Sequence, residues 1–420
     1  MRKMLIGIVL VAGVVFCTCS SYAFFVGFGS AGGVEQVIKK GQEEGKIPKV
    51  PDTGETAPAG PVQYTNAETV WQKLWDGGND DCGYGIALDR ANGGSGNVYV
   101  IGTSLNGANH DYLTIKYNSS GDTIWEKAYN GGNDDWGQGI AVDSSGNVYV
   151  TGYSWNGAND DYLTIKYNSQ GESVWVRQWD GGIDDSSYGI AVDSSGNAYV
   201  TGQSNNGANY DCITIKYNSK GDSIWLKQWD SGRNVYGYGI AVDSYGNIYV
   251  IGFSHNGLNY DFITIKYNSQ GESVWVRQWD GGSWDEGHGI AVDSSGNVYV
   301  TGQSRNGANY DCITIKYNSK GDSIWLKQWD SGRDDYGYGI AVDSSGNVYV
   351  TGQSNNGANY DCITIKYNSK GDSVWLKQWD SGRDDYGYGI AVDSSGNVYV
   401  TGQSSNGANS DYLTIKYRQF

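Results

Sequence analysis

A five-residue segment, GIAVD, recurs seven times and limits the possible folds more than any other feature of the chain. Its copies begin at Gly85, Gly139, Gly189, Gly239, Gly289, Gly339 and Gly389, and the first copy is GIALD. The last five intervals are 50 residues each, and the first is 54 because residues 90–96 lengthen one turn. Repeats of this length are typical of propellers, solenoids and arrays, in which each unit packs only against its neighbours.

Each repeat contains four strand signals separated by turn residues. In the second repeat these signals are residues 139–143, 147–152, 162–167 and 174–179, which carry Val, Ile, Tyr and Trp. Glycine-containing turns separate them. Apolar residues occur on both faces of the middle strands, as in sheets that stack between other sheets. The pattern predicts an all-β, seven-bladed β-propeller with four antiparallel strands per blade.

The strand count predicts how the ring closes. The chain ends after the third strand of its last repeat, so one outer strand is missing there. The missing strand stands at the other end, because residues 70–76 (VWQKLWD) match residues 374–380 (VWLKQWD). We therefore expect the N-terminal strand to be the outer strand of the last blade, which removes two open sheet edges.

The N-terminal part predicts export. Residues 1–23 have the features of a signal peptide, because Arg2 and Lys3 precede an apolar run and Ser-Tyr-Ala ends at a cleavage site. All four prolines lie in residues 48–61, and the proline-free remainder suits hydrogen-bonded sheet. We expect a linker over residues 24–63, with a candidate short helix at 34–40, and the propeller over 64–420. The protein is then secreted, periplasmic or on the cell surface, and membrane attachment requires an uncleaved or lipidated N-terminal segment.

Charge and cysteine positions restrict the partners and the chemistry. The net charge of −17 argues against nucleic acid, whose binding needs a basic surface. Four cysteines follow the linker: Cys82, Cys212, Cys312 and Cys362. The last three occupy one repeat position that holds Tyr or Phe in the other copies, as a packing site does. We predict buried, unpaired thiols.

The repeat resembles a known family. The segment GIAVDSSGNVYVTG, followed by DYLTIKYNSQGESVW, is similar to the bacterial SBBP repeat, and the resemblance covers residues 70–416. It implies a seven-bladed propeller outside the cytoplasm and says little about activity. The turn at residues 143–147 is also similar to NHL-type repeats, which keeps a propeller lyase or hydrolase as an alternative.

No catalytic motif is apparent, and we expect a protein that is not an enzyme. The three histidines lie in three different repeats, and no nucleophile or metal-protease motif is present. Side-chain oxygens occur at alternate positions, as in calcium loops, at Asp143, Ser145 and Asn147. A hairpin turn that begins with Asp explains this pattern better. We therefore expect no cofactor, with calcium as the alternative. The acidic pairs between blades, such as Asp184-Asp185, are interpreted as a solvated rim, with weak cation binding as the second interpretation.

The repeats differ mainly at one end of the blades. We call this end the variable face; it holds the loops between second and third strands and the loops between blades. The opposite end, the constant face, holds the nearly identical Ser-Ser-Gly turns. Aromatic residues interleaved with Asp and Asn predict that the variable face binds an extracellular polysaccharide or protein. The candidate ligand-binding residues are Trp155, Trp136, Tyr84, Tyr188, Tyr238, Trp284, His288, Tyr338 and Tyr388. Packing around the channel is an equal explanation for the tyrosines before GIAVD, and a purely structural envelope scaffold is the remaining alternative.

Overall fold

The computed structural model describes residues 14–19, 22–27, 67–89 and 96–420, which belong to two units, 1–51 and 52–420. In the first unit, β1 (Val14–Cys19) and β2 (Tyr22–Gly27) pair as an antiparallel hairpin. This hairpin includes the predicted cleavage site after residue 23. The rest of the predicted signal peptide and the candidate helix at 34–40 lie outside the described residues. Within the described parts of the chain, the structure has no helix whose length and apolarity would carry it across a membrane.

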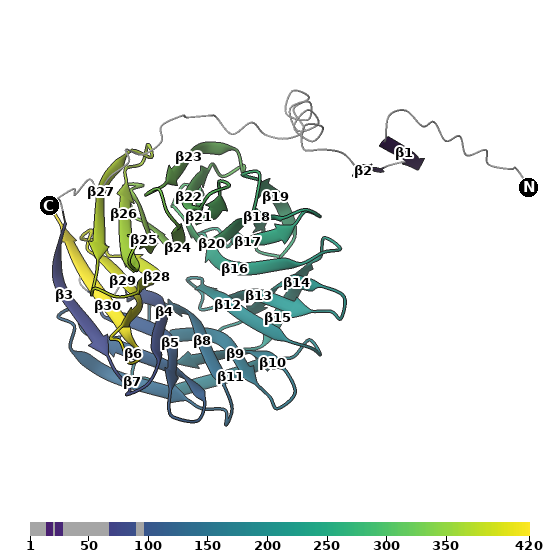
Figure 1. Cartoon of the computed structure of the whole chain (residues 1–420). Helices are drawn as coiled ribbons and strands as arrows, with labels where there is room; N and C mark the ends of the chain where they lie inside the picture. The colour runs from purple at the N-terminus through teal and green to yellow at the C-terminus, as the bar shows by residue number, and fades with distance from the viewer. Residues whose placement is uncertain (1–13, 20–21, 28–66, 90–95) are drawn as a thin grey trace, which may run out of the picture. The chain divides into compact units, whose positions relative to one another are not determined.

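The second unit is a ring of seven four-stranded antiparallel sheets, as predicted (Figure 1). The first strand of each blade is innermost: β4 (Asp81–Leu88), β8 (Asp135–Val142), β12 (Asp185–Val192), β16 (Val235–Val242), β20 (Asp285–Val292), β24 (Asp335–Val342) and β28 (Asp385–Val392). The second strands are β5 (Val98–Leu105), β9 (Val148–Trp155), β13 (Ala198–Asn205), β17 (Ile248–His255), β21 (Val298–Arg305), β25 (Val348–Asn355) and β29 (Val398–Ser405).

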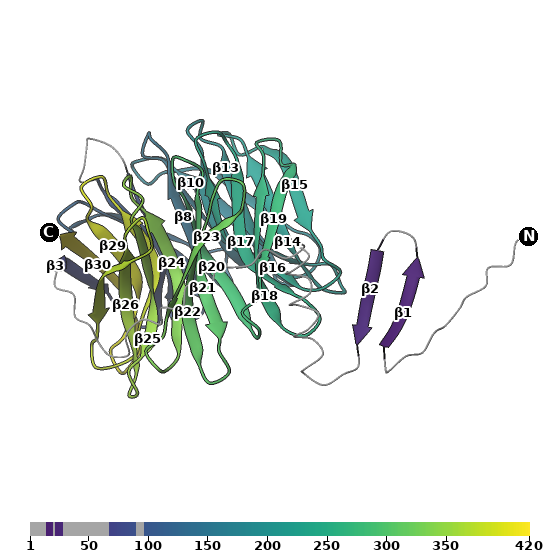
Figure 2. The same cartoon turned by 90° about the horizontal axis from the view of Figure 1, so that it is seen from above.

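The outer half of each blade follows the same order. The third strands are β6 (His110–Tyr117), β10 (Asp160–Tyr167), β14 (Tyr210–Tyr217), β18 (Tyr260–Tyr267), β22 (Tyr310–Tyr317), β26 (Tyr360–Tyr367) and β30 (Ser410–Gln419). The outermost strands are β7 (Thr123–Tyr129), β11 (Ser173–Trp179), β15 (Ser223–Trp229), β19 (Ser273–Trp279), β23 (Ser323–Trp329), β27 (Ser373–Trp379) and β3 (Ala67–Trp75). Figure 2 shows the blades from the side, with the connecting turns at their two ends.

The ring closes as predicted, because β3 pairs with β30 in the last sheet. The register places Trp75 opposite Tyr412 and Ala67 opposite Gln419. The strand starts at Ala67, three residues before the expected start, and Glu68 forms an ion pair with Arg418 in this extension. The last blade also contacts the first, where the Tyr412 hydroxyl donates to the Leu113 carbonyl over 3.1 Å.

Large aromatic and aliphatic side chains fill the space between blades. Between the second and third blades, Tyr149, Tyr162 and Trp175 pack against Val200 and Ile215, all buried. Burial of each such side chain stabilises the folded state by about 1.5–3 kcal/mol. The middle strands are therefore covered on both faces, as their composition predicts.

The prediction of free thiols is confirmed for all four cysteines, and the prediction of burial is confirmed for three of them. Cys212, Cys312 and Cys362 are buried free thiols at the position that Tyr162 fills in the second blade, and Cys82 is half-buried and free. Burial raises the pKa of the Cys212 thiol to about 12, so the group stays neutral and unreactive.

The glycine that opens GIAVD lets the inner strands approach one another closely. A Cβ on Gly139 would lie 2.7 Å from the carbonyl oxygen of Tyr188 in the next blade, and one on Gly239 would lie 2.6 Å from that of His288. Cβ atoms do not approach backbone oxygens this closely, so only glycine fits here. The glycine of each repeat therefore allows the seven inner strands to pack closely around the axis of the propeller.

Candidate functional site

The two kinds of loop assigned to the variable face lie together. Asn159, in the loop after β9, donates from Nδ2 to the Ile183 carbonyl of the following blade-to-blade loop over 2.8 Å. The Trp155 amide donates to the Asp134 carbonyl of the preceding blade-to-blade loop over 2.9 Å. The assignment of faces from the sequence is therefore correct.

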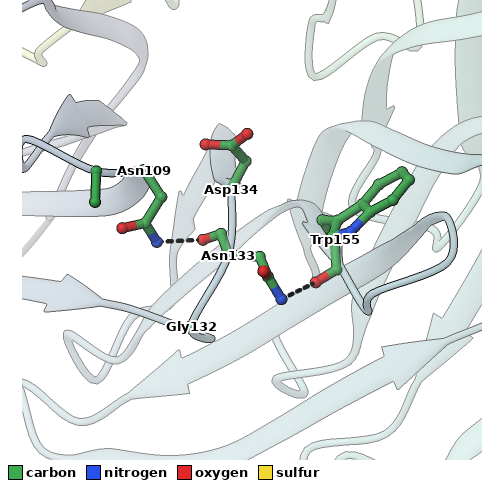
Figure 3. Close-up of a pocket in the computed structure, with 6 residues that line it drawn as sticks. Asn109, Gly132, Asn133, Asp134 and Trp155 are labelled. Atoms are coloured by element: carbon green, nitrogen blue, oxygen red, sulfur yellow. Dashed lines mark hydrogen bonds between the residues drawn. The ribbon is translucent and has the colours of Figure 1, made fainter.

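A surface hollow of about 490 Å³ lies on this face, between the first two blades (Figure 3). It is lined by Ala108, Asn109, Gly132, Asn133, Asp134 and Trp155. We call it the rim hollow. The Trp155 side chain is 38% exposed, although the equivalent residues in most other copies are polar. Asn109 Nδ2 donates to the Asn133 carbonyl over 2.5 Å, and this bond joins two of the loops that line the hollow. The hollow thus combines one exposed indole with amide and carboxylate groups.

Trp136 continues the aromatic surface from this sector toward the axis. It lies in β8, half-buried, with its ring centroid 4.1 Å from that of His110. On its other side Tyr153 lies 6.3 Å away with nearly parallel planes. Tyr153 in turn contacts Tyr188 at 6.3 Å. Aromatic rings in contact with one another therefore connect this sector with the channel-lining residue Tyr188.

Six of the candidate residues form a partial ring around the axis, which we call the channel ring. Each is an extra residue that interrupts the register of an inner strand, as Tyr188 does between Ser187 and Gly189. Neighbouring centroids lie 4.6–5.4 Å apart around the ring. Its members are Tyr188, Tyr238, His288, Tyr338, Tyr388 and Tyr84. Gln138 occupies the seventh position. Such bulges redirect side chains, here toward the axis.

The channel ring is largely occupied with its own packing. Burial raises the pKa of Tyr188 to about 12, so its hydroxyl is neutral. Tyr188 and Tyr238 stack with planes 5° apart. These contacts support the packing explanation for the tyrosines as strongly as the binding one. The remaining candidate, Trp284, is separate from them: it is 43% exposed in a blade-to-blade loop, with its ring against Tyr260 at 5.2 Å.

One sector of the channel ring contains a polar group that sequence reasoning missed. Glu286 stands where other repeats have Trp, Ser, Tyr or Cys, and its Oε2 lies 4.0 Å from His288 Nε2. Gln303 Nε2 donates to the same Glu286 oxygen over 2.7 Å. Burial lowers the pKa of His288 to about 4 and raises the pKa of Glu286. The histidine is therefore neutral near pH 7, about three pH units above that pKa. Comparing equivalent positions one at a time did not reveal that Glu286 and His288 change together in one repeat.

The constant-face turn is structural, as the sequence favoured. Asp143 accepts hydrogen bonds from the amides of Ser145 and Asn147, from Asn147 Nδ2 and from the Tyr149 hydroxyl. Both of its oxygens are thus used by the turn itself. The turn itself therefore explains the alternating oxygens at Asp143, Ser145 and Asn147.

The interpretation of the acidic pairs as a solvated rim is wrong for half of each pair. Asp184 stays partly exposed, but Asp185, which opens β12, has 0% of its surface exposed. The same holds for Asp81, Asp135, Asp285, Asp335 and Asp385. These carboxylates turn inward and accept hydrogen bonds from the loop before them, as Asp185 does from the Gly181 amide.

Comparison with known proteins agrees with this architecture. The described sheets define a seven-bladed β-propeller. The SBBP beta-propeller repeat matches residues 129–158, 174–211, 228–259, 274–311, 328–361 and 378–408. The chain belongs to the SBBP repeat family, which confirms the resemblance found in its sequence. A search of curated proteins finds no match.

Solved structures show the fold alone, at low identity. The Pan2 WD40 domain of Neurospora crassa matches with a TM-score of 0.56 and 10% identity, over 86% of this chain and 98% of that chain. Sqt1 of Chaetomium thermophilum matches with a TM-score of 0.50 and 10% identity, over 84% and 98%. A puromycin hydrolase matches with a TM-score of 0.52 and 10% identity, over 78% of this chain and 50% of that chain. The fold is thus found in WD40 domains and in a hydrolase.

Proposed function

We propose that the protein is an exported, non-catalytic binding module that holds an extracellular polysaccharide or protein segment on its variable face. The observation that carries this proposal is the exposed Trp155 indole over the rim hollow, beside the side chains of Asn109, Asn133 and Asp134. The predicted signal peptide supports export.

The chemistry of the rim hollow suits such a ligand. Its volume of about 490 Å³ is within the usual range of ligand sites, about 300–1,000 Å³. An indole face offers apolar contact area, and amides and carboxylates accept and donate the hydrogen bonds that sugar hydroxyls or a peptide backbone need. Two carboxamides and one carboxylate also favour a neutral or basic ligand over an acidic one.

The test compares the two faces of the same folded chain. A ligand is first sought with a glycan array and with a library of extended peptides, using the full-length protein. Trp155→Ala and Trp136→Ala are then compared with Ser145→Ala and Ser195→Ala on the constant face. Truncation of an aromatic anchor costs about 1–3 kcal/mol, which weakens binding roughly 5- to 150-fold. The serine variants keep the backbone bonds of their turns and should bind normally.

Two outcomes would redirect the proposal. If the serine variants lose affinity and the tryptophan variants do not, the ligand face is wrongly assigned. If neither library gives a ligand, a structural scaffold of the cell envelope becomes the better account.

A second function is favoured by one observation, the contact of Glu286 with His288. A buried carboxyl group and a neutral imidazole with shifted pKa values are the groups that general acid–base catalysis uses, so a hydrolase or lyase is the alternative. Turnover of glycan or peptide substrates that is lost in His288→Tyr, while Trp155→Ala retains it, would establish this alternative and contradict the non-catalytic proposal.

A further inference from the structure

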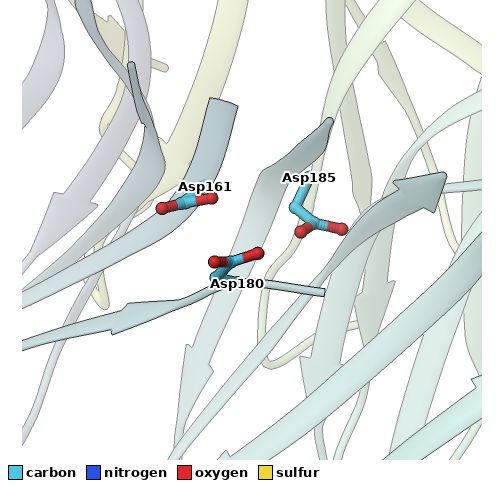
Figure 4. Close-up of side chains that lie close together, drawn as sticks. All are labelled: Asp161, Asp180 and Asp185. Carbon is cyan, nitrogen blue, oxygen red and sulfur yellow. The ribbon is translucent and has the colours of Figure 1, made fainter. Parts of the chain in front are cut away.

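Four blade junctions bring three aspartates together on the variable face. At the junction of the second and third blades they are Asp161 in β10, Asp180 directly after β11 and Asp185 at the start of β12. One carboxylate oxygen from each lies within 4.8 Å of the others, and Figure 4 shows the three groups facing one another. The equivalent clusters are Asp261, Asp280 and Asp285; Asp311, Asp330 and Asp335; and Asp361, Asp380 and Asp385.

Each cluster contains a buried oxygen that has no hydrogen-bond partner among the described residues. Asp185 is fully buried, and its Oδ1 is unpartnered, although Oδ2 accepts from the Gly181 amide. The same unpartnered Oδ1 occurs at Asp285 and Asp335, at Asp361 in the fourth cluster, and also at Asp81 and Asp135 in two junctions outside these four. A buried polar atom without a partner costs about 1–3 kcal/mol, and more when the group is charged.

The clusters also lack a positive partner. Within residues 67–89 and 96–420, no Lys or Arg forms an ion pair with any of these carboxylates. Three carboxylates this close repel one another when ionised, and a bound cation would remove that repulsion.

We propose that these four junctions are calcium-binding sites, each held by the three aspartates and reached from solvent at the outer one, which is exposed in three sites and half-buried at Asp330. The donors are oxygens only, which selects a hard cation over zinc or copper. Calcium accepts 6–8 oxygen ligands in irregular geometry, so three carboxylates with water complete a site, whereas magnesium demands a near-ideal octahedron. This inference concerns the junctions alone, and it is independent of the rim hollow and its ligand.

The chain supplies its own controls, because two junctions lack one of the three acids. Asn130 replaces the middle aspartate between Asp111 and Asp135, and its Nδ2 lies 3.4 Å from Asp111 Oδ2 as a neutral donor. Val235 replaces the inner aspartate beside Asp211 and Asp230. These two junctions should bind no calcium.

The decisive comparison uses two equivalent exposed aspartates. Asp180 and Asp230 each accept the amide of the glycine two residues later over 2.6 Å, a bond that an asparagine oxygen can also accept. Asp180→Asn and Asp230→Asn therefore make the same local change, one in a complete cluster and one in an incomplete cluster. Circular dichroism melting of both variants confirms that they fold.

The full-length chain, stripped with a chelator, is dialysed to equilibrium against calcium chloride. We expect four sites with dissociation constants of about 10⁻⁴–10⁻³ M. Asp180→Asn should lose one site, Asp230→Asn should keep all four, and Asn130→Asp should gain one. A count of five in the parent chain would add the closure junction, where Asp76, Asp81 and Asp411 hold the equivalent positions, and would support the assignment.

Three results would overturn the proposal. The first is an absence of saturable calcium binding. The second is an equal loss of bound calcium in Asp180→Asn and Asp230→Asn, which would show diffuse attraction to an acidic surface. The third is displacement of calcium by an equal concentration of magnesium.

Discussion

Asp185, which opens strand β12, and Asp193, which directly follows it, are the same residue type in opposite electrostatic states. Asp193, on the constant face, accepts hydrogen bonds from the Ser195 and Asn197 amides, from Asn197 Nδ2 and from the Tyr199 hydroxyl. Burial alone would raise the pKa of Asp193, but these bonds bring it below its ordinary value. Asp185, on the variable face, is buried with one unpartnered oxygen near two other carboxylates, and burial raises its pKa to about 6.

This contrast shows what each face does in the molecule. The constant face uses its polar groups in its own turns, which explains why one Asp-Ser-Ser-Gly-Asn sequence serves nearly every blade. The variable face has exposed indoles, the rim hollow and buried carboxylates with one unpartnered oxygen each. Buried carboxylate oxygens without a partner destabilise a fold unless a ligand or ion satisfies them, so their position supports the proposal that this protein binds through the variable face.

The largest loss of stability should come from removing strand β3, which closes the ring and so supports both faces. Deleting residues 67–75 removes β3, exposes the edge of β30 and opens the ring, so we expect a sharp fall in melting temperature and self-association. Calorimetry and light scattering measure both. Deleting residues 1–63 instead should leave the melting temperature unchanged; a comparable fall would show that the propeller does not begin where the sequence indicates.

A smaller effect should appear at the channel ring, where His288 is buried in its neutral form. The pKa of His288 falls from 6.5 to about 4 because the side chain is buried, and Glu286 is the acid that faces it. Between these pH values the unfolded chain binds a proton that the folded chain does not, so stability falls as pH decreases from 6.5 to 4.

His288→Tyr, which introduces the residue of five other repeats, removes this loss. Relative to the variant, the parent should lose about 2 kcal/mol of unfolding free energy across that range, after allowance for its partial exposure. Urea unfolding at the two ends of the range measures the difference. Parallel pH profiles for the two proteins would show that His288 keeps an ordinary pKa.

The smallest change in stability should come from removing one tyrosine hydroxyl, and it should differ between a tyrosine that hydrogen-bonds to a constant-face turn and one on the variable face. Tyr199→Phe removes the hydroxyl that donates to Asp193 over 3.0 Å and should cost about 1 kcal/mol. Tyr210→Phe is the matched change, because the Tyr210 hydroxyl makes no hydrogen bond within the described residues, and it should cost less than about 0.5 kcal/mol. Chemical denaturation of both variants gives the values, and equal costs would weaken the contrast between the faces.

Most of the fold can be predicted from the sequence because the pattern of each strand and turn recurs in seven repeats. The strand count places residues 70–76 in the last blade, and turn spacing assigns loops to faces. Strand ends are predicted less well: β8 starts at Asp135, not at Gly139. Residues 135–138 (DWGQ) lack the alternation of a strand, and only pairing with β9 makes them one.

The candidate site is predicted in part, because contacts between repeats leave no local signal. Trp155 stands out as an aromatic residue among polar equivalents, but Asn109 and Asn133 join it only where two blades meet. Asp161, Asp180 and Asp185 converge through folding alone. Their acidic loops predict solvated charge, and burial of Asp185 follows from its place at the start of an inner strand.

The most direct test of the difference between the faces is the melting temperature of Asp185→Asn and Asp193→Asn in a chelator. The change Asp185→Asn removes a carboxylate from a repulsive cluster, so the account predicts an unchanged or higher melting temperature. The change Asp193→Asn replaces an acceptor of four hydrogen bonds, so the account predicts a lower one. An equal fall in both variants would contradict the claim that the variable face holds unsatisfied carboxylates and the constant face does not.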